Sequence, residues 1–157
     1  MNLLLDTNVL IWFLSGSTRI SSKDRALIET EALGVSVSAV SLFEIATKAA
    51  ISKLHAPRDL AVRVAAARFR ALPLAMHHAE AVRDLPLHHR DPFDRLLVAQ
   101  ARIENLTLAT ADRQLAAYDV RTVEVGTERG SLDGSVLPLV ADDRLAAPVD
   151  TAWDAER

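Results

Sequence analysis

Short runs of apolar residues alternate along the chain with segments in which apolar residues recur at helical spacing. The runs 2–5 and 35–38 have the length of a strand, and each is followed by polar residues and then by a segment of helical spacing. Further strand candidates lie at 72–75, 106–109 and 120–125, and helical stretches lie near 21–33, 41–53, 58–70, 77–84 and 92–104. Strands that alternate with helices in this way predict an α/β fold with a parallel sheet covered on both faces.

This alternation stops after Gly126. The remaining residues, 127–157, contain Gly, Pro and acidic residues that interrupt any periodicity. We therefore expect one domain over residues 1–126, followed by an acidic C-terminal tail or linker over 127–157. The tail is either disordered or docked onto the domain or a partner. A chain of 157 residues has room for one domain with one core.

Composition narrows the chemistry that the domain can carry. Half of the residues are hydrophobic and a quarter are charged, as in ordinary globular proteins. The chain has no Cys, so any bound metal must use oxygen or imidazole ligands, and disulfides and thiol nucleophiles are excluded. The apolar start of the chain lacks a basic segment, carries Asp6 and Asn8, and is too short to span a bilayer. We therefore expect no membrane partner and a cytoplasmic location.

The charges are distributed unevenly between the domain and the tail. Residues 1–126 hold 15 Lys and Arg against 14 Asp and Glu, whereas residues 127–157 hold 3 against 7. The nearly neutral domain has no overall basic footprint, so nucleic-acid binding would need a local basic patch. This distribution argues against a protein that binds nucleic acid by charge alone.

Two acidic residues lie where expected strands end. Asp6 follows the first strand directly, and Asp112 lies just beyond the strand expected at 106–109. Open parallel sheets hold their ligands at this carboxyl edge, so both residues are candidates for a site. The structural alternative is that Asp6 is the N-cap of the next helix, and that Asp112 or Thr110 opens a short helix.

Two more acidic residues, Glu44 and Asp94, stand near the starts of expected helices. Ser41 and Glu44 match the S-x-x-E capping box, and this local pattern favours a capping role for Glu44 over a place in a site. Asp91 precedes Pro92 as an N-cap precedes a proline in the first helical position, so we expect Asp91 to be structural. Asp94 falls in the first turn of that helix, where the helix dipole stabilises a negative charge.

The four acids together carry more information than any one of them. Carboxylates that converge at one sheet edge repel one another and raise each other's pKa unless a cation compensates their charge. Oxygen ligands, without thiolates or an obvious His cluster, indicate Mg²⁺ or Mn²⁺. Such an ion polarises a phosphodiester and lowers the pKa of a bound water.

Four segments resemble a known family when they are taken in order: LLLDTNVLIWFL, SLFEIATK, HHRDPFDRLLVAQA and LTLATADRQL. Together they resemble PIN domains, and most closely the VapC-like ribonuclease toxins of type II toxin–antitoxin systems, over about residues 1–126. The resemblance implies a three-layer α/β/α fold with Mg²⁺ or Mn²⁺ at the acidic cluster. It also implies an endoribonuclease that hydrolyses single-stranded RNA, forms a homodimer and is inhibited by a small cognate antitoxin.

The same resemblance assigns roles to residues of this chain. Asp6 and Asp94 match the main metal ligands, while Glu44 and Asp112 complete the shell or orient the attacking water as a base. The resemblance adds three supporting residues, which are polar neighbours of these acids: Thr7, Asn8 and Thr110. Asp91 is an additional nearby acid that ranks below the four. Thr7 and Asn8 stand beside the first acid, where they can hold its carboxylate or a metal-bound water.

Other residues near the motifs are better explained as structural. His88 and His89 are able to contact a phosphate or a base, but a solvated loop is favoured for both. Trp12 and Phe13 follow the first motif at helical spacing and fit a core or a dimer interface better than a base-stacking platform.

Three alternative functions are weaker. The sequence of Asp6, Thr7 and Asn8 faintly resembles the loop of haloacid-dehalogenase-type phosphatases, but Asn8 stands where a second Asp is needed. A glycosidase would need an aromatic cleft, and only 4% of the residues are aromatic. A PIN-like fold that acts only as a catalytically inactive binding or scaffold protein is the third, and the presence of all four acids argues against it.

Overall fold

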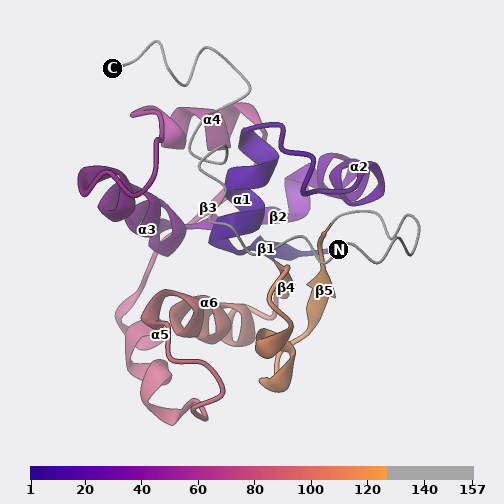
Figure 1. Cartoon of the computed structure of the whole chain (residues 1–157). Coiled ribbons are helices and arrows are strands. Elements are labelled where there is room, and N and C mark those ends of the chain that lie inside the picture. Colours follow the sequence, from indigo (N-terminus) through magenta and orange to yellow (C-terminus); the bar gives the residue numbers. More distant parts are fainter. Residues whose placement is uncertain (127–157) are drawn as a thin grey trace, which may run out of the picture.

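Five short strands form a sheet at the centre of the protein, between layers of helices (Figure 1). The computed structural model describes residues 1–126, and the tail expected over 127–157 lies outside the described residues. The strands are β1 (Leu3–Leu5), β2 (Val35–Ser38), β3 (Arg70–Leu72), β4 (Thr107–Thr110) and β5 (Thr122–Glu124). They pair in the order β3-β2-β1-β4-β5, and every pair is parallel. The predicted α/β class is therefore confirmed.

Helices connect these strands and cover both faces of the sheet. They are α1 (Thr7–Leu14), α2 (Ser22–Thr30), α3 (Ala39–Ala50), α4 (Leu60–Ala66), α5 (Met76–Ala81) and α6 (Pro92–Ile103). Three short 3-10 helices complete the described chain: η1 (Ala32–Gly34), η2 (Val82–Asp84) and η3 (Arg113–Ala117). In residues 1–126, no helix combines the length and the apolar character that a membrane span requires.

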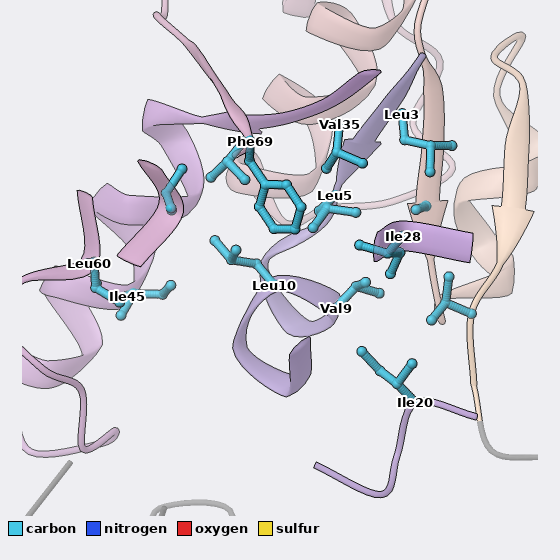
Figure 2. Packing of buried hydrophobic residues seen from close by; sticks show 14 residues of the cluster. Leu3, Leu5, Val9, Leu10, Ile20, Ile28, Val35, Ile45, Leu60 and Phe69 are labelled. Carbon is cyan, nitrogen blue, oxygen red and sulfur yellow. The ribbon is translucent and has the colours of Figure 1, made fainter. Parts of the chain in front are cut away.

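Each face of the sheet has its own hydrophobic core. Leu3 and Leu5 of β1 point to one face, where they pack with residues of α1, α2 and α4 (Figure 2). Leu4 points to the other face and packs with residues of α6. Because successive side chains of a strand point to opposite faces of the sheet, the buried strand β1 contributes to both cores, as expected for a central parallel strand. The three-layer α/β/α arrangement that the resemblance implied is confirmed.

Trp12 and Phe13 of α1 pack against the first of these cores. The ring of Phe13 also lies 5.2 Å from that of Phe69, measured between centroids. Both aromatic residues therefore contribute to the interior, as the core interpretation predicted. The helical spacing noted for Trp12 and Phe13 is confirmed by α1, although the pattern predicted no bounds for this helix because most of its residues are apolar and its faces differ little.

The strand expected at 72–75 was misplaced. Strand β3 ends at Leu72, which pairs with Ser38 at the end of β2. Pro73 has no backbone N–H to continue the ladder, so the strand stops before it. The helix expected over 58–70 is also shorter, because α4 ends at Ala66 and Arg68 adopts a positive φ of 66° that turns the chain into β3.

Helix α6 is tied to the sheet by one buried polar side chain. Gln100 has no solvent exposure, and its amide oxygen accepts a hydrogen bond from the Ser38 hydroxyl at 2.5 Å. Its amide nitrogen donates to the carbonyl of Pro73 at 3.2 Å. Gln100 therefore links α6 to the points at which β2 and β3 leave the sheet.

We expect Gln100→Leu to lower the free energy of unfolding by about 1–3 kcal/mol, because Ser38 and Pro73 would each lose a buried partner. Urea denaturation would measure this change. Gln114→Leu is the matched control, because Gln114 is exposed, and it should change the stability by less than about 0.5 kcal/mol. Equal losses in the two variants would contradict the role given to Gln100.

Candidate metal centre

The four acidic residues selected from the sequence meet at the carboxyl edge of the sheet. Asp6 follows β1 and precedes α1, and Asp112 follows β4 and precedes η3. Glu44 lies on α3, which begins where β2 ends, and Asp94 lies in the first turn of α6. The negative charges of Asp6 and Glu44 both contribute to raising the pKa of Asp94, in agreement with their position at the same edge.

Asp6 is both a helix cap and a member of the cluster. Its Oδ1 accepts a hydrogen bond from the backbone N–H of Val9 at 2.7 Å, so it is the N-cap of α1. Burial raises the pKa of Asp6 from 3.8 to about 6, although hydrogen bonds from the Thr110 hydroxyl and from two backbone N–H groups oppose this rise. The charge of Glu44 raises the pKa further. The structural and functional interpretations of Asp6 are therefore compatible.

Glu44 does not form the expected capping box. Helix α3 begins at Ala39 and is capped by Ser38, so Ser41 already lies inside the helix. The buried carboxylate of Glu44 instead accepts a hydrogen bond from the Thr7 hydroxyl at 2.6 Å. Its other oxygen lies 2.6 Å from the ammonium of Lys48. The capping hypothesis is wrong because a partner on α1 holds the carboxylate inside the cluster.

Asp94 is the acid whose charge is least compensated. Burial, followed by the charge of Asp91, raises the pKa of Asp94 to about 7, and His89 opposes this rise. The one polar contact recorded for its carboxylate in the described part of the chain is Nε2 of His89, at 3.5 Å. Asp91 itself is the N-cap of α6, as predicted, because its Oδ1 accepts from the backbone N–H of Phe93 at 2.8 Å.

Asp112 is the most exposed of the four acids, and both of its carboxylate oxygens accept hydrogen bonds. Oδ1 accepts from the backbone N–H of Gln114 at 2.8 Å, which makes Asp112 the N-cap of η3. Oδ2 lies 3.0 Å from Nε2 of His89. The backbone N–H of Asp112 donates to the Thr110 hydroxyl at 3.0 Å, and that hydroxyl in turn bonds to Asp6. Thr110 therefore connects the first acid to the last.

The supporting residues divide into two groups. Thr7 and Thr110 hold acids of the cluster, although Thr7 contacts Glu44 rather than its neighbour Asp6. Asn8 is exposed, and in residues 1–126 its side chain makes no recorded hydrogen bond to the cluster. Its role therefore stays a prediction.

His89 lies inside the cluster, although the sequence favoured a solvated loop. Only 17% of its side chain is exposed, and its ring lies between the carboxylates of Asp94 and Asp112. His88 packs its ring edge-on against Tyr118 with centroids 5.0 Å apart. No periodicity predicts this placement, because the loop that carries His89 is enclosed by residues distant in sequence.

The donor set fits a hard divalent cation. Carboxylate oxygens are the ligands that Mg²⁺ and Mn²⁺ prefer. Burial raises the pKa of both Asp6 and Asp94, and the charges of nearby carboxylates raise both values further. A bound cation would offset this penalty on the ionised forms. The acids therefore form a candidate metal centre, for which the resemblance implied Asp6 and Asp94 as the principal ligands.

A second group of side chains, His77, His78 and Glu104, is also close enough to hold an ion. The backbone N–H of Ala75 donates to Nδ1 of the buried His78 at 3.0 Å, so the ring carries its proton on Nε2. Nε2 lies 2.7 Å from the carboxylate of Glu104 and donates to it. This group is therefore a hydrogen-bonded link between α5 and α6 rather than a ligand set.

Comparisons with known proteins agree with this architecture. The chain matches the family model described as the PIN domain over residues 3–121. A crystal structure of DNA-bound VapBC from Salmonella typhimurium is similar, with 18% identity, a TM-score of 0.61, and coverage of 79% of this chain and 98% of that chain. FitAcB from Neisseria gonorrhoeae is similar at 22% identity and a TM-score of 0.56, with coverage of 78% and 96%.

A toxin–antitoxin complex from Klebsiella pneumoniae gives 20% identity and a TM-score of 0.55, and covers 77% of this chain and 95% of that chain. No curated protein matches the chain at a significant level. At these identities, the likeness to the solved structures is one of fold.

The acidic cluster gives the metal-free protein a distinctive dependence of stability on pH. In the unfolded chain, the carboxyl groups of Asp6 and Asp94 have a pKa near 3.8. In the folded protein, the pKa is about 6 for Asp6 and about 7 for Asp94. Between these values the folded state binds more protons, so the free energy of unfolding falls as the pH rises. Asp94→Asn removes a carboxylate whose ionised form is disfavoured by burial and by neighbouring acids, and should raise the Tm of the metal-free protein at about pH 8 by roughly 3–10 °C.

Calorimetry in the presence of a chelator would measure this gain, which should vanish towards about pH 4, where Asp94 is protonated in the wild type. Asp119→Asn is the matched control, because the side chain of Asp119 is fully exposed, and it should leave the Tm unchanged. A lower Tm for Asp94→Asn at the higher pH would show that Asp94 is not an uncompensated charge.

Proposed function

This chain belongs to the PIN domain family, and on that ground we propose that it is a Mg²⁺- or Mn²⁺-dependent endoribonuclease that cleaves single-stranded RNA. The observation that carries the proposal is the convergence of four carboxylates at one sheet edge, with raised pKa values at two of them. A catalytically inactive scaffold has no need to hold uncompensated charges together, because their repulsion costs stability.

In this proposal, Asp6 and Asp94 hold the metal ion. When bound, the ion polarises the phosphodiester and lowers the pKa of an attacking water. Glu44 is buried and paired with Lys48 and Thr7, so we assign it a structural role, in which it holds α3 against α1 beside the ion. Asp112 is the most exposed acid of the cluster, and we assign it to complete the ligand shell of the ion beside Asp94.

Partners are proposed on the fold likeness. The similar structure from Klebsiella pneumoniae is a toxin–antitoxin complex, and the four sequence motifs resemble VapC-like toxins. We therefore propose that the chain is the toxin of such a pair, that it forms a homodimer, and that a small cognate antitoxin inhibits it in the cytoplasm. Residues 1–126 would form the nuclease domain, and residues 127–157 a separate tail or linker.

The nuclease activity is testable with labelled single-stranded and hairpin RNAs, incubated with Mg²⁺, Mn²⁺ or a chelator. We expect cleavage of single-stranded RNA that requires the metal. Asp6→Asn and Asp94→Asn should each lower the rate by at least about 100-fold, because each removes a principal ligand. Asp119→Asn, at a fully exposed position, should cleave like the wild type.

Two outcomes would contradict the proposal. A folded, metal-loaded protein that cleaves no RNA and no phosphomonoester would be a binding or scaffold protein. Turnover of phosphomonoesters without cleavage of RNA would make the chain a phosphatase.

The toxin role is tested by inducible expression in a bacterium that lacks the antitoxin. We expect the wild-type chain to arrest growth and Asp94→Asn to relieve the arrest at the same protein level, because arrest would depend on the intact metal centre. Colony counts and immunoblots would measure both quantities. Normal growth with a wild-type chain that is active in the same extract would rule out the toxin role while leaving the nuclease in place.

A further inference from the structure

His89 occupies a position in the acidic cluster that the four acids do not account for. Its Nε2 lies 3.0 Å from Oδ2 of Asp112 and 3.5 Å from Oδ2 of Asp94. These three side chains are close enough to form a ligand set with one nitrogen and two oxygens. The hydrogen bonds around the ring decide whether His89 is a ligand or a donor.

The backbone fixes the tautomer of His89. The N–H of Asp91 donates to Nδ1 of the ring at 3.0 Å, so Nδ1 must offer its lone pair. A neutral imidazole then carries its single proton on Nε2, which donates to the carboxylate of Asp112. Ligation of a metal through Nε2 would move that proton to Nδ1, against the N–H of Asp91. The geometry therefore makes His89 a hydrogen-bond donor rather than a ligand.

A network around Arg95 holds the loop that presents this ring. The backbone N–H of His89 donates to the hydroxyl of Tyr118 at 2.9 Å, and the buried guanidinium of Arg95 donates to the same hydroxyl at 3.2 Å. Arg95 also donates to carbonyls on both sides of the loop, namely those of Val82, Leu85, Pro86 and His89. Since Arg95 directly follows Asp94 on α6, one turn of helix fixes both the acid and the ring that faces it.

We propose that His89 is a positioning residue of the metal centre, whose Nε2–H holds the carboxylate of Asp112 beside that of Asp94. This inference rests on the proposed metal-dependent function. Without the donor, two carboxylates on separate elements, α6 and η3, would face each other with no group between them. His89 thereby keeps the third and fourth acids of the cluster assembled before an ion arrives, and leaves the ion to the carboxylate oxygens.

Binding of Mn²⁺ to the full-length protein, followed by the electron paramagnetic resonance signal of the free ion, tests this role without RNA. We expect His89→Ala to weaken Mn²⁺ binding by roughly 10-fold or more, the usual loss when a group that orients a metal ligand is removed. His89→Gln should recover most of the affinity, because a glutamine amide can donate near the position of Nε2. His88→Ala is the matched control from the same loop and should bind like the wild type.

The cleavage assay adds a second expectation. His89→Ala should lower kcat and leave KM nearly unchanged, because the residue acts on the acids and not on the RNA. The tautomer is observable directly in long-range ¹H–¹⁵N spectra of the histidine rings. His89 should carry its proton on Nε2 both without metal and with Mg²⁺.

Three outcomes would contradict the role of His89 or the metal centre. If the proton of the His89 ring moves from Nε2 to Nδ1 when Mg²⁺ is added, Nε2 is a ligand of the ion, and the positioning role is overturned. The role is overturned equally by a His89→Ala variant that binds Mn²⁺ as tightly as the wild type, or more tightly. A wild-type protein that binds no divalent cation would instead overturn the metal centre itself, together with this inference.

Discussion

Because β1, β2 and β4 run parallel, the chain leaves the sheet at the same edge three times, and a new helical segment begins there each time. The first turn of a helix needs an acceptor for its free N–H groups, and its dipole stabilises a negative charge. Acidic side chains at this edge therefore serve two purposes. Asp6 and Asp112 cap their helices and belong to the acidic cluster at the same time. The direction of the strands thus dictates where the chemistry is found.

The repulsion that this arrangement creates is only partly relieved within the protein. Lys48 and Thr7 satisfy Glu44, and His89 satisfies Asp112. The pKa values of the other two acids of the cluster, Asp6 and Asp94, are raised first by burial and further by neighbouring carboxylates. Ionisation of Asp6 and Asp94 therefore lowers the stability of the folded protein, and a bound cation would offset this loss.

Much of the fold was predictable because it depends on local patterns. The central strands lie within a residue of their expected positions, since continuous apolar runs of this length are typical of strands buried on both faces. The start of α6 was predictable from Asp91 and Pro92. The errors have local causes as well, because Pro73 ends β3 early and the mostly apolar α1 offers too little contrast between its faces to predict its bounds. The four acids lie at the sheet edge where they were expected, and their roles as ligands stay a prediction.

The partners of those acids were not predictable, because they come from elsewhere in the chain. Ser41 and Glu44 satisfy the local capping pattern, yet Thr7 of another helix holds Glu44 inward. His89 resembles a loop residue until Arg95 and Tyr118 enclose it. A single acid at the start of a helix therefore says little about function, because capping and ligation favour the same positions. What distinguishes a site is the number of acids that the topology brings to one edge, together with the burial that raises the pKa values of two of them.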